Sequence, residues 1–287
     1  MDKQKTLVFI GAHPDDESFG IGGTLVQYTA AGYRAYYICG TRGEVGLDDP
    51  SPANLRGFES VGDLRWHELE CAAEVLGLSG VRWLGYRDSG MPGSPDNTHP
   101  DAFAAAPVEE AAGRVVKILR ELKPEVVITH DPIGGYRHPD HIAAHNAAVK
   151  AYWAASDPEQ YPEAGPVYQP QKLYYHTMPH RLMKLAVKLM PLFGGDPHHF
   201  GRHGDVDLTK LVETEFPVHA VIKINKKPAQ TRLRAVSCHA SQLGGGSGRG
   251  GILNLLRRLT GPKDSYMRAD PPPKGRRKEK DLFEGVV

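Results

Sequence analysis

Short apolar runs alternate with amphipathic segments along the first half of the chain. Four of the runs are rich in β-branched or aromatic residues, which is typical of buried strands in a parallel sheet. Strands are expected at 6–10, 34–39, 81–84 and 126–129, and helices near 25–29 and at 64–76, 107–122 and 141–155. This alternation predicts an α/β fold in which helices flank a Rossmann-like, mostly parallel sheet.

After residue 156 the periodicity is weaker. It indicates strands at 172–176 and 218–224, a basic amphipathic helix at 181–192 and another helix at 227–238. We therefore expect three parts along the chain. They are a Rossmann-like metal-binding catalytic core over 1–160, a smaller C-terminal lobe over 161–270 that completes the sheet and the substrate pocket, and a tail over 271–287.

The composition excludes several kinds of partner. The 287 residues carry a formal net charge of +1, so no nucleic-acid or charged-membrane partner is indicated. No apolar run reaches about 18 residues and no signal segment precedes the first strand, which predicts a cytoplasmic protein without stable membrane insertion. Cys39, Cys71 and Cys238 are far apart and lack C-x-x-C spacing, so neither a disulfide framework nor a thiolate zinc site is expected.

Two polar clusters lie in the segments that leave the first and the fourth expected strand. The first is Ala12-His13-Pro14-Asp15-Asp16-Glu17, and the second is His138-Pro139-Asp140-His141. Open α/β sheets bring such segments together at the carboxyl ends of their strands. Catalytic zinc takes three nitrogen or oxygen ligands, and two histidines with one carboxylate supply that set. The remaining carboxylate and imidazole match the proton transfers of hydrolysis.

These paired motifs resemble the LmbE-like N-acetylglucosaminyl-phosphatidylinositol de-N-acetylase superfamily, whose members are zinc-dependent amide hydrolases. The resemblance extends over roughly residues 5–155. Tyr86-Arg87-Asp88-Ser89-Gly90-Met91 and Gly134-Gly135-Tyr136 are similar to the mycothiol-pathway branch of this superfamily. That branch contains a deacetylase of N-acetylglucosaminyl-inositol and an amidase of mycothiol S-conjugates.

The resemblance implies a role for each residue of the two clusters. The implied zinc ligands are His13, Asp16 and His141. Asp15 is implied as the general base, and His138 as the general acid and oxyanion-stabilising imidazole. Asp140 is then expected to orient His138 or to tune its proton affinity.

Substrate contacts follow from the same resemblance. Tyr136 matches a mobile tyrosine that polarises the substrate carbonyl, and Asp88 matches a carboxylate that binds sugar hydroxyls. Arg56 and Arg65 are both candidates for a basic substrate contact, and the sequence does not separate them. His239 is either a structural histidine near the site or a further substrate contact.

A histidine-rich loop offers a competing metal site. His198, His199 and His203 lie close together in the sequence. Loop histidines are usually solvated, and we expect the same here. Residues 180–215, which contain this loop, show no clear likeness to either mycothiol-pathway enzyme, so the sequence does not identify the pocket wall that selects the substrate.

The leading hypothesis is a zinc-dependent N-deacetylase acting on a small amino-sugar substrate that contains N-acetylglucosamine, with iron(II) as an alternative metal. A second hypothesis keeps the site but cleaves a larger amide, such as a mycothiol-type S-conjugate. The lysine that the amidase branch carries after its acidic cluster is missing here, which argues against it. A non-catalytic sugar- or metal-binding protein is the alternative of another class. The oligomeric state is open, and a homo-oligomer is one alternative.

Overall fold

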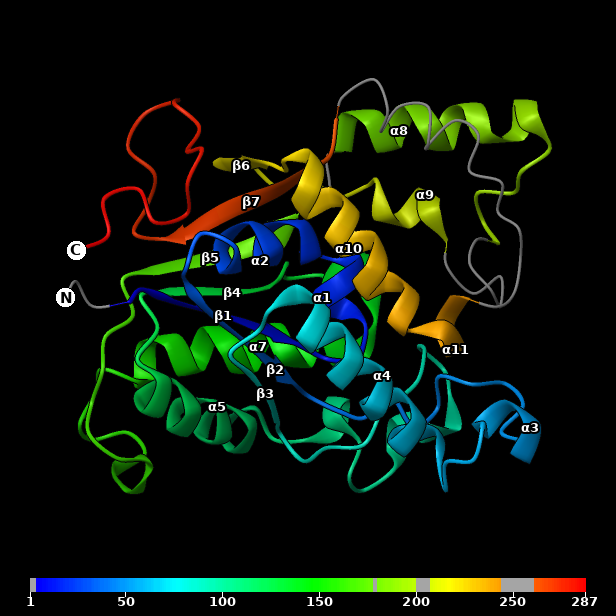
Figure 1. The fold of residues 1–287 in the computed structure, drawn as a ribbon, viewed down its shortest axis with the longest axis horizontal. Helices are drawn as coiled ribbons and strands as arrows, with labels where there is room; N and C mark the ends of the chain where they lie inside the picture. Colours follow the sequence, from blue (N-terminus) through cyan, green and yellow to red (C-terminus); the bar gives the residue numbers. More distant parts are fainter. Residues whose placement is uncertain (1–3, 178–179, 200–206, 244–260) are drawn as a thin grey trace.

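One sheet positions the rest of the molecule. The computed structural model describes residues 4–177, 180–199, 207–243 and 261–287. Seven strands form this sheet in the order β3-β2-β1-β4-β5-β7-β6 (Figure 1). The first five strands of the chain run parallel, and β7 pairs antiparallel with both β5 and β6. The strands are β1 (Thr6–Gly11), β2 (Arg34–Cys39), β3 (Gly80–Trp83), β4 (Val126–His130), β5 (Lys172–Thr177), β6 (Ala220–Lys223) and β7 (Lys263–Asp270).

The strand order reverses between β1 and β4. β2 and β3 lie on one side of β1, whereas β4 and β5 lie on the other. At such a reversal the connections leave toward opposite faces of the sheet and open a crevice at the carboxyl ends of the strands. The two polar clusters of the sequence follow β1 and β4, so the fold brings both to one crevice. The predicted Rossmann-like α/β fold is confirmed.

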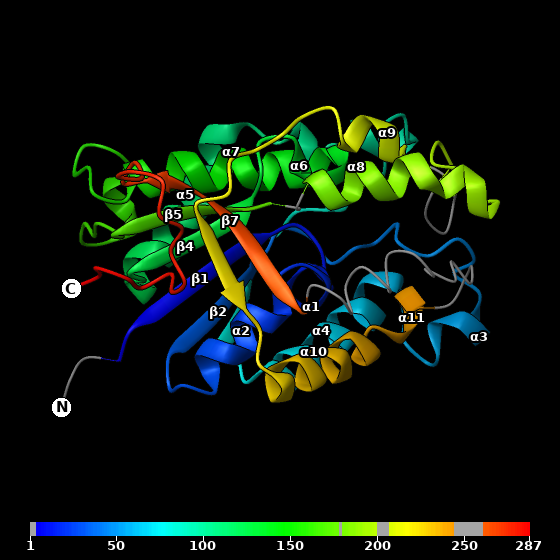
Figure 2. The same ribbon diagram turned by 90° about the horizontal axis from the view of Figure 1, so that it is seen from above.

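Helices cover both faces of the sheet. The helices are α1 (Asp16–Phe19), α2 (Gly22–Thr29), α3 (Pro52–Leu55), α4 (Val61–Leu76), α5 (Val108–Leu122), α6 (Gly134–Arg137), α7 (Pro139–Ala154), α8 (His180–Leu189), α9 (Leu208–Leu211), α10 (Lys226–Cys238) and α11 (Ala240–Leu243). α5 and α7 lie on one face, and α2, α4 and α10 on the other (Figure 2). No helix in the described part of the chain is long and apolar enough to cross a bilayer.

Strand β1 shows why its sequence is continuously apolar. Val8 and Ile10 are buried with α5 and α7, whereas Leu7 and Phe9 are buried with α2 and α4. A strand covered on both faces has no solvent-facing positions, so its hydrophobic residues do not alternate with polar ones.

The carboxy-terminal part differs most from expectation. The sequence pattern does not predict β7, because Asp264, Arg268 and Asp270 interrupt its apolar side chains. The expected tail also contributes to the core, since Leu282 and Phe283 are buried in the cluster on the α2 face. The division of the chain at residues 160 and 270 remains a prediction, and β5, β6 and β7 all extend the same sheet.

The expectation that the cysteines form no disulfide is wrong. Cys71 on α4 and Cys238 at the end of α10 are bonded to each other, with Cα atoms 5.8 Å apart and a sequence separation of 167. The sequence spacing gives no sign of this pair, because the bond depends on α10 packing beside α4. Cys39 is buried and free.

Candidate active site and metal centre

The segment after β1 turns sharply and gathers its polar side chains at the crevice. Asp16 Oδ2 accepts the backbone N–H groups of Ala12 and His13 at 2.8 and 3.0 Å. The Tyr37 hydroxyl donates to the carbonyl of His13 at 2.6 Å, and a Cβ on Gly11 would lie only 2.7 Å from that hydroxyl oxygen. The turn therefore requires glycine at the strand end, and its own hydrogen bonds hold His13 and Asp16 in buried positions.

The second cluster begins helix α7. His138 is the N-cap residue, and its Nδ1 accepts the backbone N–H of Asp140 at 3.1 Å. Pro139 occupies the first turn, where its missing N–H costs nothing. Because Nδ1 of His138 is an acceptor, the neutral ring carries its proton on Nε2. The cap thus places His141 one turn into the helix, facing the loop after β1.

The donor atoms of the two loops meet at His141. Its Nε2 lies 3.2 Å from Nδ1 of His13 and 3.3 Å from Oδ1 of Asp16. Two donors at this separation can both lie about 2.1 Å from one cation. Ligand atoms within 4.8 Å of one another form three overlapping groups: His13, His138 and His141; His13, Asp88, His138 and Asp140; and Asp16, His130 and His141. The predicted ligands His13 and Asp16 fall in different groups, and both groups that contain one of them with His141 place it within 3.3 Å of the His141 nitrogen. The assignment of these three residues as ligands stays a prediction.

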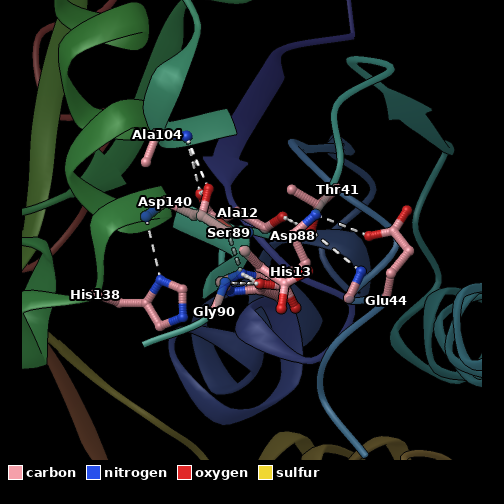
Figure 3. Close-up of polar contacts among 12 residues, drawn as sticks. Ala12, His13, Thr41, Glu44, Asp88, Ser89, Gly90, Ala104, His138 and Asp140 are labelled. Carbon is pink, nitrogen blue, oxygen red and sulfur yellow. Dashed lines mark hydrogen bonds and ion pairs between the residues drawn. The ribbon is translucent and has the colours of Figure 1, made fainter. Parts of the chain in front are cut away.

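Carboxylates behind His13 determine which of its ring nitrogens faces the crevice. Nε2 of His13 lies 3.1 Å from Oδ2 of Asp140 and 3.5 Å from Oδ1 of Asp88 (Figure 3). Nε2–H therefore donates to a carboxylate and leaves Nδ1 toward His141, as in many metal-binding histidines. Burial would lower the pKa of His13, but Asp88 and Asp140 raise this pKa well above its usual value. A cation that binds Nδ1 must then displace a proton.

Asp140 contacts several groups at the crevice, His13 and His138 among them. Its carboxylate accepts the N–H groups of Ser89 and Ala104 at 2.9 and 3.1 Å, together with the hydroxyl of Ser89 (Figure 3). The first turn of α7 directs this side chain toward Ser89 and His13, and the backbone N–H of the same residue donates to Nδ1 of His138. Asp140 therefore contacts both histidines, and its predicted role toward His138 stays a prediction. It affects His138 through charge: burial and His13 lower the pKa of His138 to about 4, and Asp140 opposes that shift.

Asp15 lies at the crevice beside Arg65. Its Oδ2 accepts a hydrogen bond from Nη2 of Arg65 at 3.0 Å, and its side chain keeps 21% of its surface exposed. Burial raises the pKa of Asp15 to about 6, against the opposing charge of Arg65. A carboxyl group with a pKa near neutrality is suited to accept and return a proton.

The two candidate arginines have different surroundings. Arg65 is buried and donates to the carbonyls of Pro14 and Gly43 at 2.8 and 3.1 Å, in addition to Asp15. Arg56 is half exposed, and its Nη1 lies 3.8 Å from Oε1 of Glu68. Arg65 is therefore part of the wall of the site, whereas the Arg56 guanidinium reaches solvent. A substrate contact by either arginine stays a prediction.

Asp88 and His239 also have protein partners. Asp88 is buried between His13 and Arg65, and burial, which would raise its pKa, is outweighed by these cations, which lower it. His239 is fully buried, and its Nε2 lies 2.7 Å from Oε1 of Glu17. Burial would lower the pKa of His239, and Glu17 raises it. The substrate contacts predicted for Asp88 and His239 stay predictions.

Tyr136 connects the crevice to the region of α8 and α9. Its ring centroid lies 5.0 Å from that of His141 and 5.8 Å from that of His138. The same ring packs against a small apolar cluster that contains Val187 of α8 and Leu208 of α9. Burial raises the pKa of Tyr136 well above its usual value, so its hydroxyl remains a hydrogen-bond donor.

His130 is a site residue that the sequence analysis does not single out. It is the last residue of β4, and its Nε2 lies 3.2 Å from Oδ2 of Asp16. Its ring stacks on that of His141, with centroids 4.0 Å apart. The available signal is its place at the carboxyl end of a strand next to the reversal of strand order.

The histidine-rich loop does not contribute to the crevice in the part of the chain that the structure describes. His198 and His199 are exposed and lie 3.4 and 2.8 Å from carboxylate oxygens of Asp207 and Asp196. Neither belongs to a group of ligand atoms among the described residues. His203 lies outside the described residues.

Comparison with known proteins extends these observations. The family described as "PIG-L: GlcNAc-PI de-N-acetylase" matches residues 8–152. Relatives from Streptomyces avermitilis and Geodermatophilus obscurus are both named 1D-myo-inositol 2-acetamido-2-deoxy-alpha-D-glucopyranoside deacetylase. The former is 35% identical over 294 residues (99% of this chain, 98% of the relative), and the latter is 34% identical over 250 residues (85% and 84%). The fold resembles N,N'-diacetylchitobiose deacetylase from Pyrococcus horikoshii, with a TM-score of 0.63 at 20% identity, over 93% of this chain and 84% of that one. The chain therefore belongs to the PIG-L family of de-N-acetylases.

Proposed function

We propose that this amide hydrolase removes the acetyl group from N-acetylglucosaminyl-inositol, with zinc bound in the crevice. Hydrolysis of the acetamide would yield acetate and a free amino sugar. Membership of the family and the names of the relatives support the coarser statement, an N-deacetylase of an N-acetylglucosamine glycoside. The observation that carries the proposal is the meeting of donor atoms from His13, Asp16 and His141 beside Asp15.

The donor set fits a divalent cation. Burial lowers the pKa of His141 well below its usual value, so the ring is neutral, as a metal ligand must be. Asp16 supplies a charged oxygen: burial would raise its pKa, but His141 and His130 lower it well below its usual range. Two imidazole nitrogens and a carboxylate oxygen suit zinc and iron(II) alike. When bound, the cation supplies Lewis acidity that activates a water molecule and polarises a carbonyl oxygen.

Asp15 carries out the proton transfers in this proposal. Its carboxylate accepts a proton from the attacking water, and the bond to Arg65 keeps it oriented. The protonated carboxyl group then has a proton to return to the leaving amine.

His138 and Tyr136 stabilise the developing oxyanion. The N-cap bond leaves a proton on Nε2 of His138, so the neutral ring can donate a hydrogen bond to the oxyanion. This geometry favours the oxyanion-stabilising half of the role predicted for His138 over the general-acid half, because protonating Nδ1 would break the cap. The protonated hydroxyl of Tyr136 is a second donor.

The test combines two variants with acetate release and metal analysis. Asp15→Ala is expected to keep its zinc but lose turnover by about 10²–10⁴-fold, since only the proton acceptor is removed. His13→Ala is expected to lose both. Cysteinyl-glucosamine conjugates, assayed beside N-acetylglucosaminyl-inositol, separate acetamide hydrolysis from cleavage of a larger amide. Unchanged hydrolysis by Asp15→Ala, or no acetate release by zinc-loaded wild type, would contradict the proposal.

A further inference from the structure

Asp15 has a backbone conformation that L-amino acids rarely adopt. Its φ is 128° and its ψ is −25°, at the residue that precedes α1. A non-glycine residue in such a region costs on the order of 1–3 kcal/mol and persists only where its surroundings enforce it. The contacts around Asp15 must therefore supply that constraint.

Arg65 and Glu17 hold the side chain and the backbone of Asp15. Arg65 Nη2 donates to Oδ2 of Asp15 at 3.0 Å and to the carbonyl of Pro14 at 2.8 Å. The backbone N–H of Asp15 donates to Oε2 of Glu17 at 3.0 Å. Arg65 thus binds the carboxylate and the carbonyl that precedes Asp15, and Glu17 binds the N–H of the same peptide unit.

His239 fixes Glu17 in turn. Both side chains are fully buried, and Nε2 of His239 lies 2.7 Å from Oε1 of Glu17. The hydroxyl of Ser18 donates to the same oxygen at 2.6 Å. A buried carboxylate needs such partners, and the loss of one partner leaves a charge poorly compensated. Glu17 therefore has one oxygen fixed by His239 and Ser18 and the other available to Asp15.

The two supports of Asp15 are joined behind the crevice. Arg65 lies on α4, and His239 directly follows α10. Cys71 of α4 and Cys238 of α10 form the disulfide, so His239 is adjacent in sequence to the bond between these helices. The packing of α10 beside α4 thus sets both contacts to Asp15 (Figure 1).

We propose that Glu17 and His239 are positioning residues that hold the strained backbone of Asp15 and so direct its carboxylate toward the scissile amide. Neither residue touches the reacting atoms in this role, which rests on the proposed function of Asp15. For His239 this role agrees with the structural alternative of the sequence analysis, and its contact with substrate stays a prediction. Loss of either residue releases the backbone N–H of Asp15, and the carboxylate moves away from Arg65.

The variants to compare are His239→Leu and Glu17→Ala, with His219→Leu and Glu125→Gln as matched controls. His219 is a partly buried histidine whose Nδ1 accepts one backbone N–H, and Glu125 is a buried carboxylate at the opposite ends of the strands. Each test variant is expected to lower kcat by about 10–100-fold, because a small displacement of a catalytic group is costly. Its KM and zinc content are expected to change by less than about twofold, and the controls are expected to keep their kcat.

A double-mutant cycle tests whether the effect passes through Asp15. In an Asp15→Asn background, His239→Leu is expected to change the residual rate by less than about twofold. Glu17→Gln keeps an oxygen for the N–H of Asp15, and it is expected to recover part of the activity that Glu17→Ala loses. An additive loss in the Asp15→Asn background, or a loss of zinc in His239→Leu, would overturn the positioning role.

Crystal structures of the wild type and of His239→Leu give a readout that does not depend on turnover. The variant is expected to show Asp15 at negative φ, with Oδ2 beyond hydrogen-bond distance of Arg65. An unchanged Asp15 in this variant overturns the positioning role, whatever the substrate is. Absence of acetate release by the zinc-loaded wild type instead overturns the proposed function.

Discussion

The loops after β1 and β4 and the segment around α10 contribute to the site in different ways. The loops provide the donor atoms of the proposed metal centre, on His13, Asp16 and His141. Residues 226–243, which contain α10 and α11, instead contact Glu17, Ser18 and Phe19, which follow Asp16 in the chain. The comparison teaches that reactive groups and the groups that hold them come from distant parts of this chain.

Two further contacts show the same supporting role. Arg232 of α10 donates to the carbonyls of Ser18 and Phe19 at 2.9 and 2.6 Å, at the end of α1. Ser241 donates through its backbone N–H and its hydroxyl to Glu68 of α4 at 2.7 and 2.6 Å. Loss of a proposed ligand in the loops should therefore lower metal content and turnover, whereas changes around α10 should alter stability or geometry while the metal stays bound.

The largest effect is expected for His141→Ala, which removes the nitrogen shared by two of the three groups of ligand atoms. Zinc content should fall to background, and acetate release should fall by at least about 10³-fold, because the Lewis acid is lost. Metal analysis of the purified protein and the acetate assay measure the two losses. His219→Ala is the control, and normal zinc binding by His141→Ala would contradict the proposal that the loops bind the metal.

A smaller effect is expected for Asp140→Asn. An amide in place of the carboxylate weakens the hydrogen bond that keeps Nδ1 of His13 directed at the cation. Zinc affinity should fall by about 10–100-fold, the usual consequence of altering a partner behind a ligand. Competition with a chromophoric chelator measures this affinity, and Asp96→Asn, at a surface ion pair with Arg87, is the control. Equal zinc affinities for the variant and the wild type would contradict a role of Asp140 in zinc binding.

On the α10 side, Cys71→Ser should lower the free energy of unfolding by about 2–5 kcal/mol, because the disulfide restricts a long loop in the unfolded chain. Zinc content should stay unchanged. Thermal unfolding with and without a reductant measures the effect. The reductant should lower the Tm of the wild type and leave that of Cys71→Ser unaltered. If the reductant leaves the Tm of the wild type unchanged, the disulfide does not stabilise the packing of α4 and α10.

The smallest effect is expected for Ser241→Ala. The variant keeps the backbone N–H that Glu68 accepts but loses the hydroxyl, which should cost about 1–2 kcal/mol of stability. Denaturant unfolding measures that cost, and the acetate assay should show kcat within about twofold of the wild type. A loss of zinc in this variant would contradict the separation between the two regions.

Local signals in the sequence account for much of the fold. β1 and β4 are short apolar runs, and α5 has acidic residues in its first turn. Gly77 ends α4 in the left-handed conformation that favours glycine, as expected for a helix closed by this residue. β7 lacks such a signal, because its pairing with β5 and β6 and not its own pattern makes it a strand.

The site follows the same rule. The motifs around His13 and His141 could be recognised because their residues are close in sequence. The contact of Asp140 with His13, the stacking of His130 on His141 and the disulfide all depend on segments that meet only in the folded chain. Sequence could therefore point to the side chains of the proposed site but not to the partners that surround them.

The ring of Tyr136 has one side toward His141 and another toward Val187 and Leu208. Substitutions on α8 or α9 can thus shift the Tyr136 hydroxyl, which the proposed mechanism places at the oxyanion, without altering the proposed ligands or Asp15. Under that mechanism, remodelling of this outer region would change the rate on a given amide while metal binding stays the same.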